Sequence, residues 1–167
     1  MGFPLEGVRV VALEQAVAAP LCTRHLADLG ADVVKIERPD GGDFARRYDS
    51  VVGGLSAYFV WLNRGKRSLT LDFKAPGGRE LLDRLLAQAD IVVQNMGPGV
   101  AERLDLGATA LRARHPRLVV CELSGYGSSK SPCTLRTRNP CSRMARKCSP
   151  RATKLTSWPA FASSPPK

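Results

Sequence analysis

The first residues arranged like a ligand site lie where two expected strands end. A strand over 8–13 runs into the turn 14–20, and a second strand over 32–37 ends on the acidic Glu37. This pattern would suit a dinucleotide if glycines in the first turn let the backbone approach the pyrophosphate, but the turn 14–20 contains no glycine. NAD-dependent chemistry is therefore disfavoured, although the N–H groups of the following helix still suit an anion or a ligand amide. We expect Glu37 to pair with a neighbouring side chain rather than to act in catalysis.

Histidine and cysteine are the other residue types that often hold metals or act as nucleophiles. His25 and His115 fall on expected helical segments, without a carboxylate or cysteine at metal-ligand spacing. Cys22 and Cys121 are typical of inert buried thiols. The three cysteines beyond residue 129 match no zinc spacing, and no histidine lies near them to complete one. We therefore expect no metal site and no cysteine nucleophile.

The spacing of apolar residues predicts the elements that position these side chains. Short β-branched runs indicate buried strands, and alternation indicates one more, so that strands are expected at 8–13, 32–37, 68–72, 91–93 and 118–121. Helical periodicity and capping residues indicate helices at 19–29, 57–62, 76–89, 100–104 and 109–113. Pro20 suits the first turn of the first helix and Gly30 its C-terminal cap, whereas 43–67 is otherwise expected to be loose. This alternation predicts an α/β fold with a Rossmann-like, doubly wound, mainly parallel sheet.

The positive charge of the chain is confined to its C-terminal part. The formal net charge is +10, yet residues 130–167 hold nine Lys and Arg and no Asp or Glu, which leaves a net +1 for residues 1–129. All 15 glycines precede residue 130, and the apolar residues after it are scattered singly. We therefore predict two regions: a folded domain over 1–129 and an irregular, basic, Pro/Ser/Arg-rich tail over 130–167.

Three explanations of the tail compete. It is a disordered basic segment, a nucleic-acid-binding arm, or the product of a shifted reading frame. Nucleic-acid binding is disfavoured because the tail lacks interleaved aromatic residues and a recognition module. We favour the shifted frame, because Arg, Pro, Ser, Ala, Thr and Cys are the residues that the wrong frame of a GC-rich gene tends to encode.

Five segments in order resemble the family III CoA-transferases (CaiB/BaiF type), a family that includes formyl-CoA transferases and α-methylacyl-CoA racemases. The segments are 4–10, 26–39, 62–68, 90–100 and 123–127. Each alone is weak, but five in the right order, spread between residues 4 and 129, are strong evidence. The resemblance implies that this part supplies much of a Rossmann-like domain and of a CoA site.

The resemblance also implies which residues contact CoA: Ala18, Arg38, Leu71, Lys74, Asn95, Met96, Arg103 and Leu104. The cations among them can pair with the pyrophosphate and ribose phosphate of CoA. Asn95 offers amide donors and acceptors, while Met96 and Leu71 offer apolar cover for the adenine or pantetheine. The alternative is that the three cations are ordinary solvated surface charges. CoA or acyl-CoA is thus the expected substrate, and no tightly bound cofactor is expected.

The resemblance also implies a catalytic aspartate, and the sequence has none at the expected place. Transferases of this kind use an aspartate that attacks the acyl-CoA thioester, and racemases pair that aspartate with a His-Asp element. That aspartate would follow the motif at 124–127, but no Asp or Glu occurs after Glu122. We therefore expect a truncated acyl-CoA transferase or racemase relative that lacks its catalytic residue and is inactive.

Two function classes remain open at this point. The first is this truncated CoA-transferase relative, for which the family implies a homodimer that the fragment is not expected to form readily. The second is a non-catalytic nucleotide-binding or interaction module whose basic tail contacts nucleic acid or acidic partners, with salt-sensitive binding. No apolar run is long enough for a membrane span and no secretion signal is evident, so a cytoplasmic location without membrane contact is expected.

Overall fold

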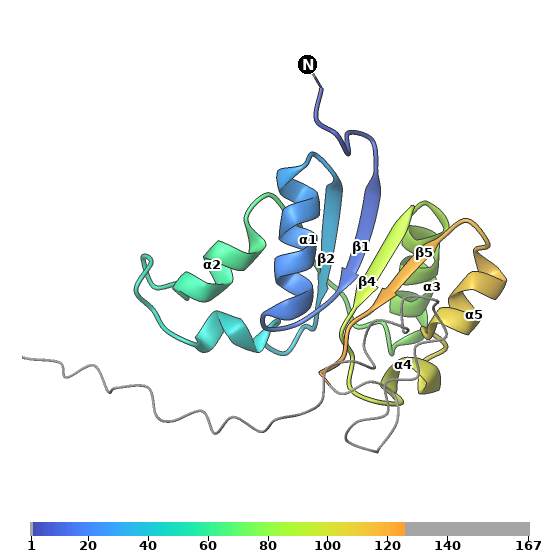
Figure 1. The fold of residues 1–167 in the computed structure, drawn as a ribbon. Helices are drawn as coiled ribbons and strands as arrows, with labels where there is room; N and C mark the ends of the chain where they lie inside the picture. The colour runs from blue at the N-terminus through green and yellow to red at the C-terminus, as the bar shows by residue number, and fades with distance from the viewer. Residues whose placement is uncertain (1, 126–167) are drawn as a thin grey trace, which may run out of the picture. The chain divides into compact units, whose positions relative to one another are not determined.

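The computed structural model describes residues 2–125, and these form a five-stranded, all-parallel sheet in the order β3-β2-β1-β4-β5 (Figure 1). The strands are β1 (Arg9–Leu13), β2 (Asp32–Glu37), β3 (Arg67–Thr70), β4 (Ile91–Gln94) and β5 (Val119–Glu122). The chain runs outward from β1 to β3, then returns to the other side of β1 for β4 and β5. This is the doubly wound arrangement of Rossmann-like domains, as the sequence predicted. What was predicted for the tail, including its boundary at 129/130, lies outside the described residues.

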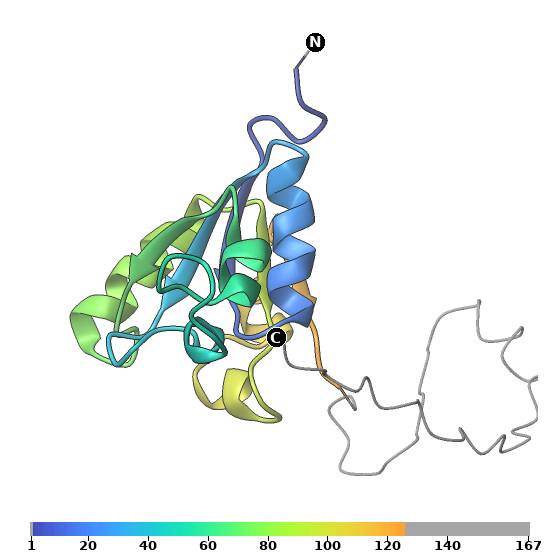
Figure 2. The same cartoon turned by 90° about the vertical axis from the view of Figure 1, so that its left-hand side faces the viewer.

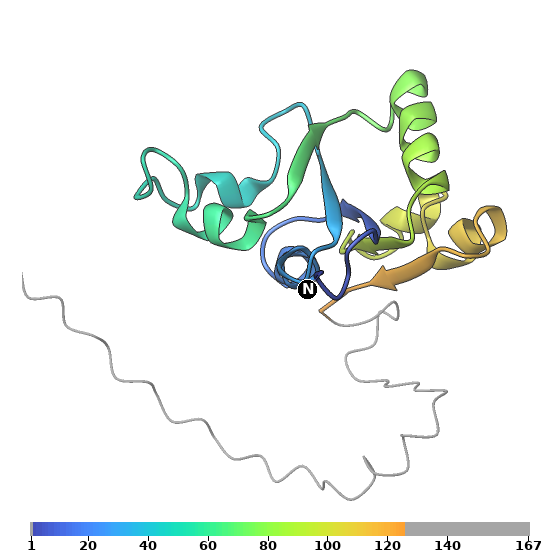
Figure 3. The same cartoon turned by 90° about the horizontal axis from the view of Figure 1, so that it is seen from above.

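Helices cover both faces of the sheet, as Figures 2 and 3 show from two directions. They are α1 (Ala18–Asp28), η1 (Phe44–Arg47), α2 (Ala57–Asn63), α3 (Pro76–Ala87), α4 (Val100–Arg103) and α5 (Ala108–Arg114). The helices α1 and α2 lie on one face and α3 and α5 on the other, while η1 and α4 lie where the strands end (Figure 1). Every predicted helix and strand is present, with ends that differ by a few residues at most. The short helix η1 is an addition within the stretch that was expected to be loose.

Alternating side chains of the strands divide between two cores. Val11 and Leu13 of β1 pack with Leu82 and Leu86 of α3, whereas Val10 of β1 faces the α1 side. Gly30 follows the C-cap of α1 with φ 99°, the left-handed conformation in which glycine terminates helices at low cost. The predicted C-terminal cap is therefore confirmed. With both faces covered, the carboxyl ends of β1, β2 and β4 are left to form a site.

Candidate functional site

A cavity of about 350 Å³ lies at the carboxyl ends of β1, β2 and β4. The strand order reverses between β1 and β4, and in open α/β sheets ligands bind at this switch point. The walls come from the loops that follow these strands, from η1 and α4, and from the segment between β3 and α3. Ile36, Phe44 and Phe73 give the cavity a largely apolar lining.

The structure brings five of the eight predicted CoA residues into the wall of this cavity: Arg38, Lys74, Asn95, Met96 and Leu104. Ala18 lies instead in a neighbouring cavity of about 480 Å³, which shares Asn95 and Met96 with the first. Leu71 is half-buried against the core on the α3 side. Arg103 is exposed at the end of α4 and lies outside both walls. Six of the eight predicted residues therefore line two adjoining cavities, but Leu71 and Arg103 are not part of either cavity.

Two cations stand at the rim of the cavity. Arg38 is exposed, forms a 3.5 Å ion pair with Asp40, and donates from Nη2 to the Gly42 carbonyl at 3.4 Å. Lys74 is also exposed, and its backbone N–H donates to Asp72. Neither cation is held in a buried pair, so both can turn toward an anionic group at the mouth of the cavity.

The loop between β1 and α1 forms one wall without any glycine. Ala16 has φ 63°, a left-handed conformation that costs a non-glycine residue about 1–2 kcal/mol. Both backbone polar groups of Gln15 bond the amide of Asn95, at 2.9 Å and 2.8 Å, and the Ala16 N–H donates to Asp43 at 3.1 Å. Side chains from two other loops thus stabilise the turn where a dinucleotide-binding protein would carry glycines.

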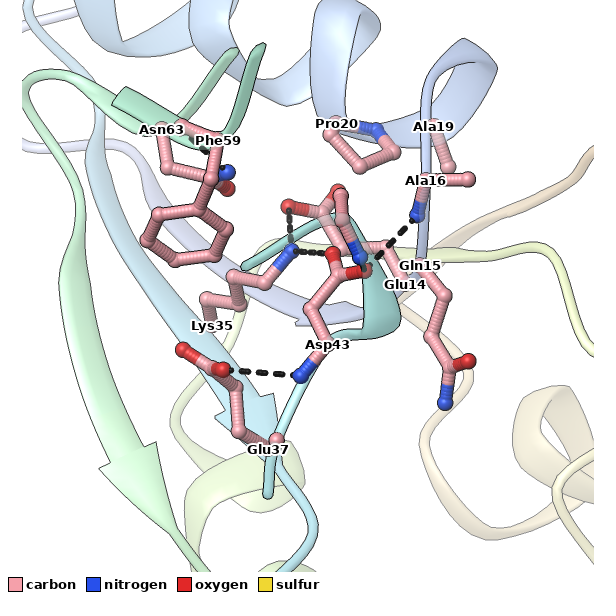
Figure 4. A network of polar contacts seen from close by, with 12 residues as sticks. Glu14, Gln15, Ala16, Ala19, Pro20, Lys35, Glu37, Asp43, Phe59 and Asn63 are labelled. Carbon is pink, nitrogen blue, oxygen red and sulfur yellow. Dashed lines mark hydrogen bonds and ion pairs between the residues drawn. The ribbon is translucent and has the colours of Figure 1, made fainter. Parts of the chain in front are cut away.

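Four buried charges lie behind this loop, on the α1 and α2 side of the sheet (Figure 4). Lys35 Nζ lies 2.7 Å from Asp43 and 3.6 Å from Glu14, and Lys66 Nζ lies 2.7 Å from Glu14. The four side chains are at most 1% exposed. Burial lowers the pKa of Lys66, and the neighbouring Glu14 carboxylate opposes that shift. Two cations and two carboxylates balance, as buried charges must if they are to remain ionised.

Glu37 pairs with its neighbours, which confirms the prediction made for it. Its carboxylate accepts two 2.7 Å hydrogen bonds from Arg46, one of 2.7 Å from Ser68, and one of 3.0 Å from the Asp43 N–H. Burial alone would raise the pKa of Glu37, but these hydrogen bonds outweigh burial and lower the pKa to about 2. Glu37 is therefore an ionised anchor for η1 and not a proton donor at neutral pH.

Comparison with known proteins identifies the family, because residues 5–137 match the model of CoA-transferase family III. The chain belongs to CoA-transferase family III. It is 41% identical over 124 residues to a formyl-CoA:oxalate CoA-transferase of Bradyrhizobium sp. (strain ORS 278), covering 74% of this chain and 29% of that relative. An acyl-CoA transferase of Fusarium pseudograminearum (strain CS3096) is 41% identical over 132 residues, with the same two shares.

Solved structures of the family agree with this fold. Rv3272 from M. tuberculosis matches with a TM-score of 0.72 and 41% identity, covering 78% of this chain and 37% of that one. A CaiB/BaiF family protein from Brucella suis matches with a TM-score of 0.71 and 40% identity over 78% of this chain and 36% of that one. The chain spans about 30% of the length of the Bradyrhizobium and Fusarium relatives. It therefore corresponds to an N-terminal portion of the family.

Analysis of the sequence did not predict the buried charges of this family III chain. One signal was present: Lys35 stands between Val34 and Ile36 in a strand that was expected to be buried. A lysine in such a place is almost never buried without a partner, so it pointed to a carboxylate close by. Its partners Glu14 and Asp43 lie in loops 21 and 8 residues away, where periodicity gives no information.

Among residues 2–125 of this family III chain, the histidines and cysteines form no site. His25 is exposed on α1, and His115 follows α5, a little beyond the helix on which it was expected. Burial raises the pKa of the Cys22 thiol, with smaller contributions from Cys121 and Glu14, which keeps the thiol protonated. Within residues 2–125, no cluster of His, Cys, Asp and Glu is suited to a metal ion, and no helix is long and apolar enough to cross a membrane.

Proposed function

We propose that this chain forms the CoA-binding part of an acyl-CoA transferase and binds CoA or an acyl-CoA thioester in the cavity at the β1/β4 switch point. The observation that carries the proposal is the convergence of Arg38, Lys74, Asn95, Met96 and Leu104 on one cavity. Membership of CoA-transferase family III supplies the chemical class of the ligand.

Each part of CoA has a suitable counterpart at the site. Arg38 and Lys74 at the rim suit the pyrophosphate and ribose phosphate. Met96 and Leu104 suit the adenine or the start of the pantetheine, and Asn95 contributes to the same wall. Ala18 in the neighbouring cavity suits the pantetheine arm, since the two cavities meet at Asn95 and Met96. For Arg103 and Leu71 a contact with CoA rests on the family resemblance alone.

For the whole protein we propose transfer of CoA between carboxylic acids, with formyl-CoA and oxalate as the first pair to test. Relatives at 40–41% identity carry that name. The sequence has no Asp or Glu after Glu122, so it lacks a carboxylate at the place where the resemblance puts the nucleophile. We therefore propose that these 167 residues bind CoA without transferring it.

Titration calorimetry of the full chain with CoA tests the binding. We expect saturable binding that weakens about 5- to 10-fold in Arg38→Ala and in Lys74→Ala, as for the loss of one charge-assisted contact. Arg84→Ala is the matched control, because Arg84 is exposed in the last turn of α3 and lies outside both cavities. Dephospho-CoA should remove the effect of whichever cation binds the ribose phosphate. Absence of heat at millimolar CoA would overturn the proposal.

A further inference from the structure

The loop after β1 is held on one side by Asn95. The Asn95 Oδ1 accepts from the Gln15 N–H at 2.9 Å, and its Nδ2 donates to the Gln15 carbonyl at 2.8 Å. The two residues are 80 positions apart in the sequence, so this pair forms only when β1 and β4 lie side by side. The side-chain amide of Asn95 thus acts on the loop, although the residue lines the cavity.

Asp43 holds the next residue of the loop, Ala16, as Figure 4 shows. Its Oδ1 accepts from the N–H groups of Ala16 and Ala45 at 3.1 Å and 2.9 Å, while its Oδ2 accepts from Lys35 Nζ at 2.7 Å. The Asp43 backbone N–H donates in turn to Glu37 at 3.0 Å. Asp43 is therefore fixed at both of its carboxylate oxygens and at its backbone.

These contacts hold Gln15 and, next to it, Ala16, whose backbone conformation is unfavourable. Ala16 has φ 63°, which glycine adopts freely and alanine avoids. Gln15 and Ala16 are both wall residues of the cavity of about 350 Å³. A change in the conformation of this pair would therefore change the shape of the cavity.

We propose that Asn95 and Asp43 are positioning residues that together clamp Gln15 and Ala16 in the conformation that shapes the CoA cavity. Their side chains act on the loop and not on CoA. The link to CoA affinity rests on the proposed function, whereas the clamp itself exists without a ligand. In dinucleotide-binding proteins, glycines adopt the conformation of the corresponding turn without strain. Here side-chain hydrogen bonds hold residues other than glycine in the turn.

Asn95→Ala in the full chain tests the clamp, because Asp43 substitutions leave the buried Lys35 without its nearest partner and risk unfolding. We expect the amide hydrogen exchange of Gln15 and Ala16 to accelerate at least about tenfold. The dissociation constant for CoA should rise about tenfold. Gln88→Ala is the control: it also removes a side-chain amide, but Gln88 is exposed at the C-cap of α3 and lies outside the cavity. That control should leave both readouts within about twofold.

A second-site change separates positioning from general destabilisation. In the background Ala16→Gly, which adopts the left-handed conformation freely, Asn95→Ala should weaken CoA binding by only about threefold. An equal loss in both backgrounds, or unchanged exchange of both amides in Asn95→Ala, would overturn the proposal. If the unaltered chain binds no CoA while the two amides respond as expected, the proposed function fails and the clamp stands.

Discussion

The two faces of the sheet are stabilised by different chemistry. On the face covered by α3 and α5, Ile36 and Val92 pack against buried leucines such as Leu82. On the face covered by α1 and α2, the same strands present small apolar side chains next to a set of buried charges that includes Lys35 and Glu37. Adjacent residues of β2 therefore contribute to two unlike interiors. The apolar face should lose stability gradually with lost volume, whereas the charged face depends on the presence of every partner.

The largest expected effect comes from breaking the charged face at its centre. Lys35→Met leaves Glu14 and Asp43 to share Lys66, and we expect the free energy of unfolding to fall by about 3–5 kcal/mol. Urea denaturation measures this loss. Lys74→Met makes the same chemical change at an exposed position and should shift stability by no more than about 0.5 kcal/mol. Similar losses in the two variants would remove the distinction between the faces.

Removing a buried side chain from the apolar face should lower the free energy of unfolding by somewhat less than Lys35→Met does. Leu82 is fully buried, so Leu82→Ala is expected to lower the free energy of unfolding by about 3 kcal/mol. Leu82→Met conserves volume and should cost less than about 1.5 kcal/mol, because the apolar face has no partners to leave unpaired. The same denaturation series checks both. Equal losses for the two substitutions would contradict a face that responds to lost volume.

The charged face should make the stability of the chain depend on pH, through the ionisation of Glu37. The pKa of Glu37 falls from 4.5 to about 2 in the folded chain, so its stabilising contribution is present above pH 4.5. That contribution is lost as the pH falls from about 4.5 to about 2, and we expect it to amount to about 3 kcal/mol. The stability difference between the unaltered chain and Glu37→Gln should therefore shrink across this range. A difference that stays constant down to pH 2 would show that Arg46 and Ser68 do not hold the carboxylate ionised.

The smallest effect concerns the helix that covers the charged face. Ser56 caps α2 by accepting from the Phe59 N–H at 3.3 Å, and Ser56→Ala should lower stability by about 1 kcal/mol. Thermal melting followed by circular dichroism measures the change. Ser56→Asp keeps a capping acceptor but places its negative charge beside Asp49. Its stability should therefore lie between that of the unaltered chain and that of Ser56→Ala. A loss of stability as large as that of Lys35→Met would contradict this expectation, because it would mean that the buried charges depend on the cap of α2.

The same contrast explains what the sequence could predict. The leucines of α3 and the β-branched runs of β2 and β4 repeat with the period of their element, so the positions of strands and helices along the chain follow from local patterns. Arg38, Asn95 and Met96 were found because they belong to segments that resemble a family. The partners of Lys35 could not be found in this way, because ion pairs depend on which loops meet in space. The left-handed Ala16 was equally hidden, since the side chains that bond Ala16 and its neighbour Gln15, those of Asp43 and Asn95, come from distant loops.

The central position of β1 also sets the order in which the molecule assembles during synthesis. The Arg9 N–H bonds the carboxylate of Asp90, which is 81 residues further along the chain. A ribosome adds about 5–20 residues per second, so one edge of β1 waits roughly 4–16 s for its partner while β2 is already available. Pairings of such long range are slow to form and leave strand edges open to other chains in the meantime. Because Asn95 follows β4, the walls of the cavity are among the last parts of the sheet to come together, and a nascent chain must be shielded from aggregation until they do.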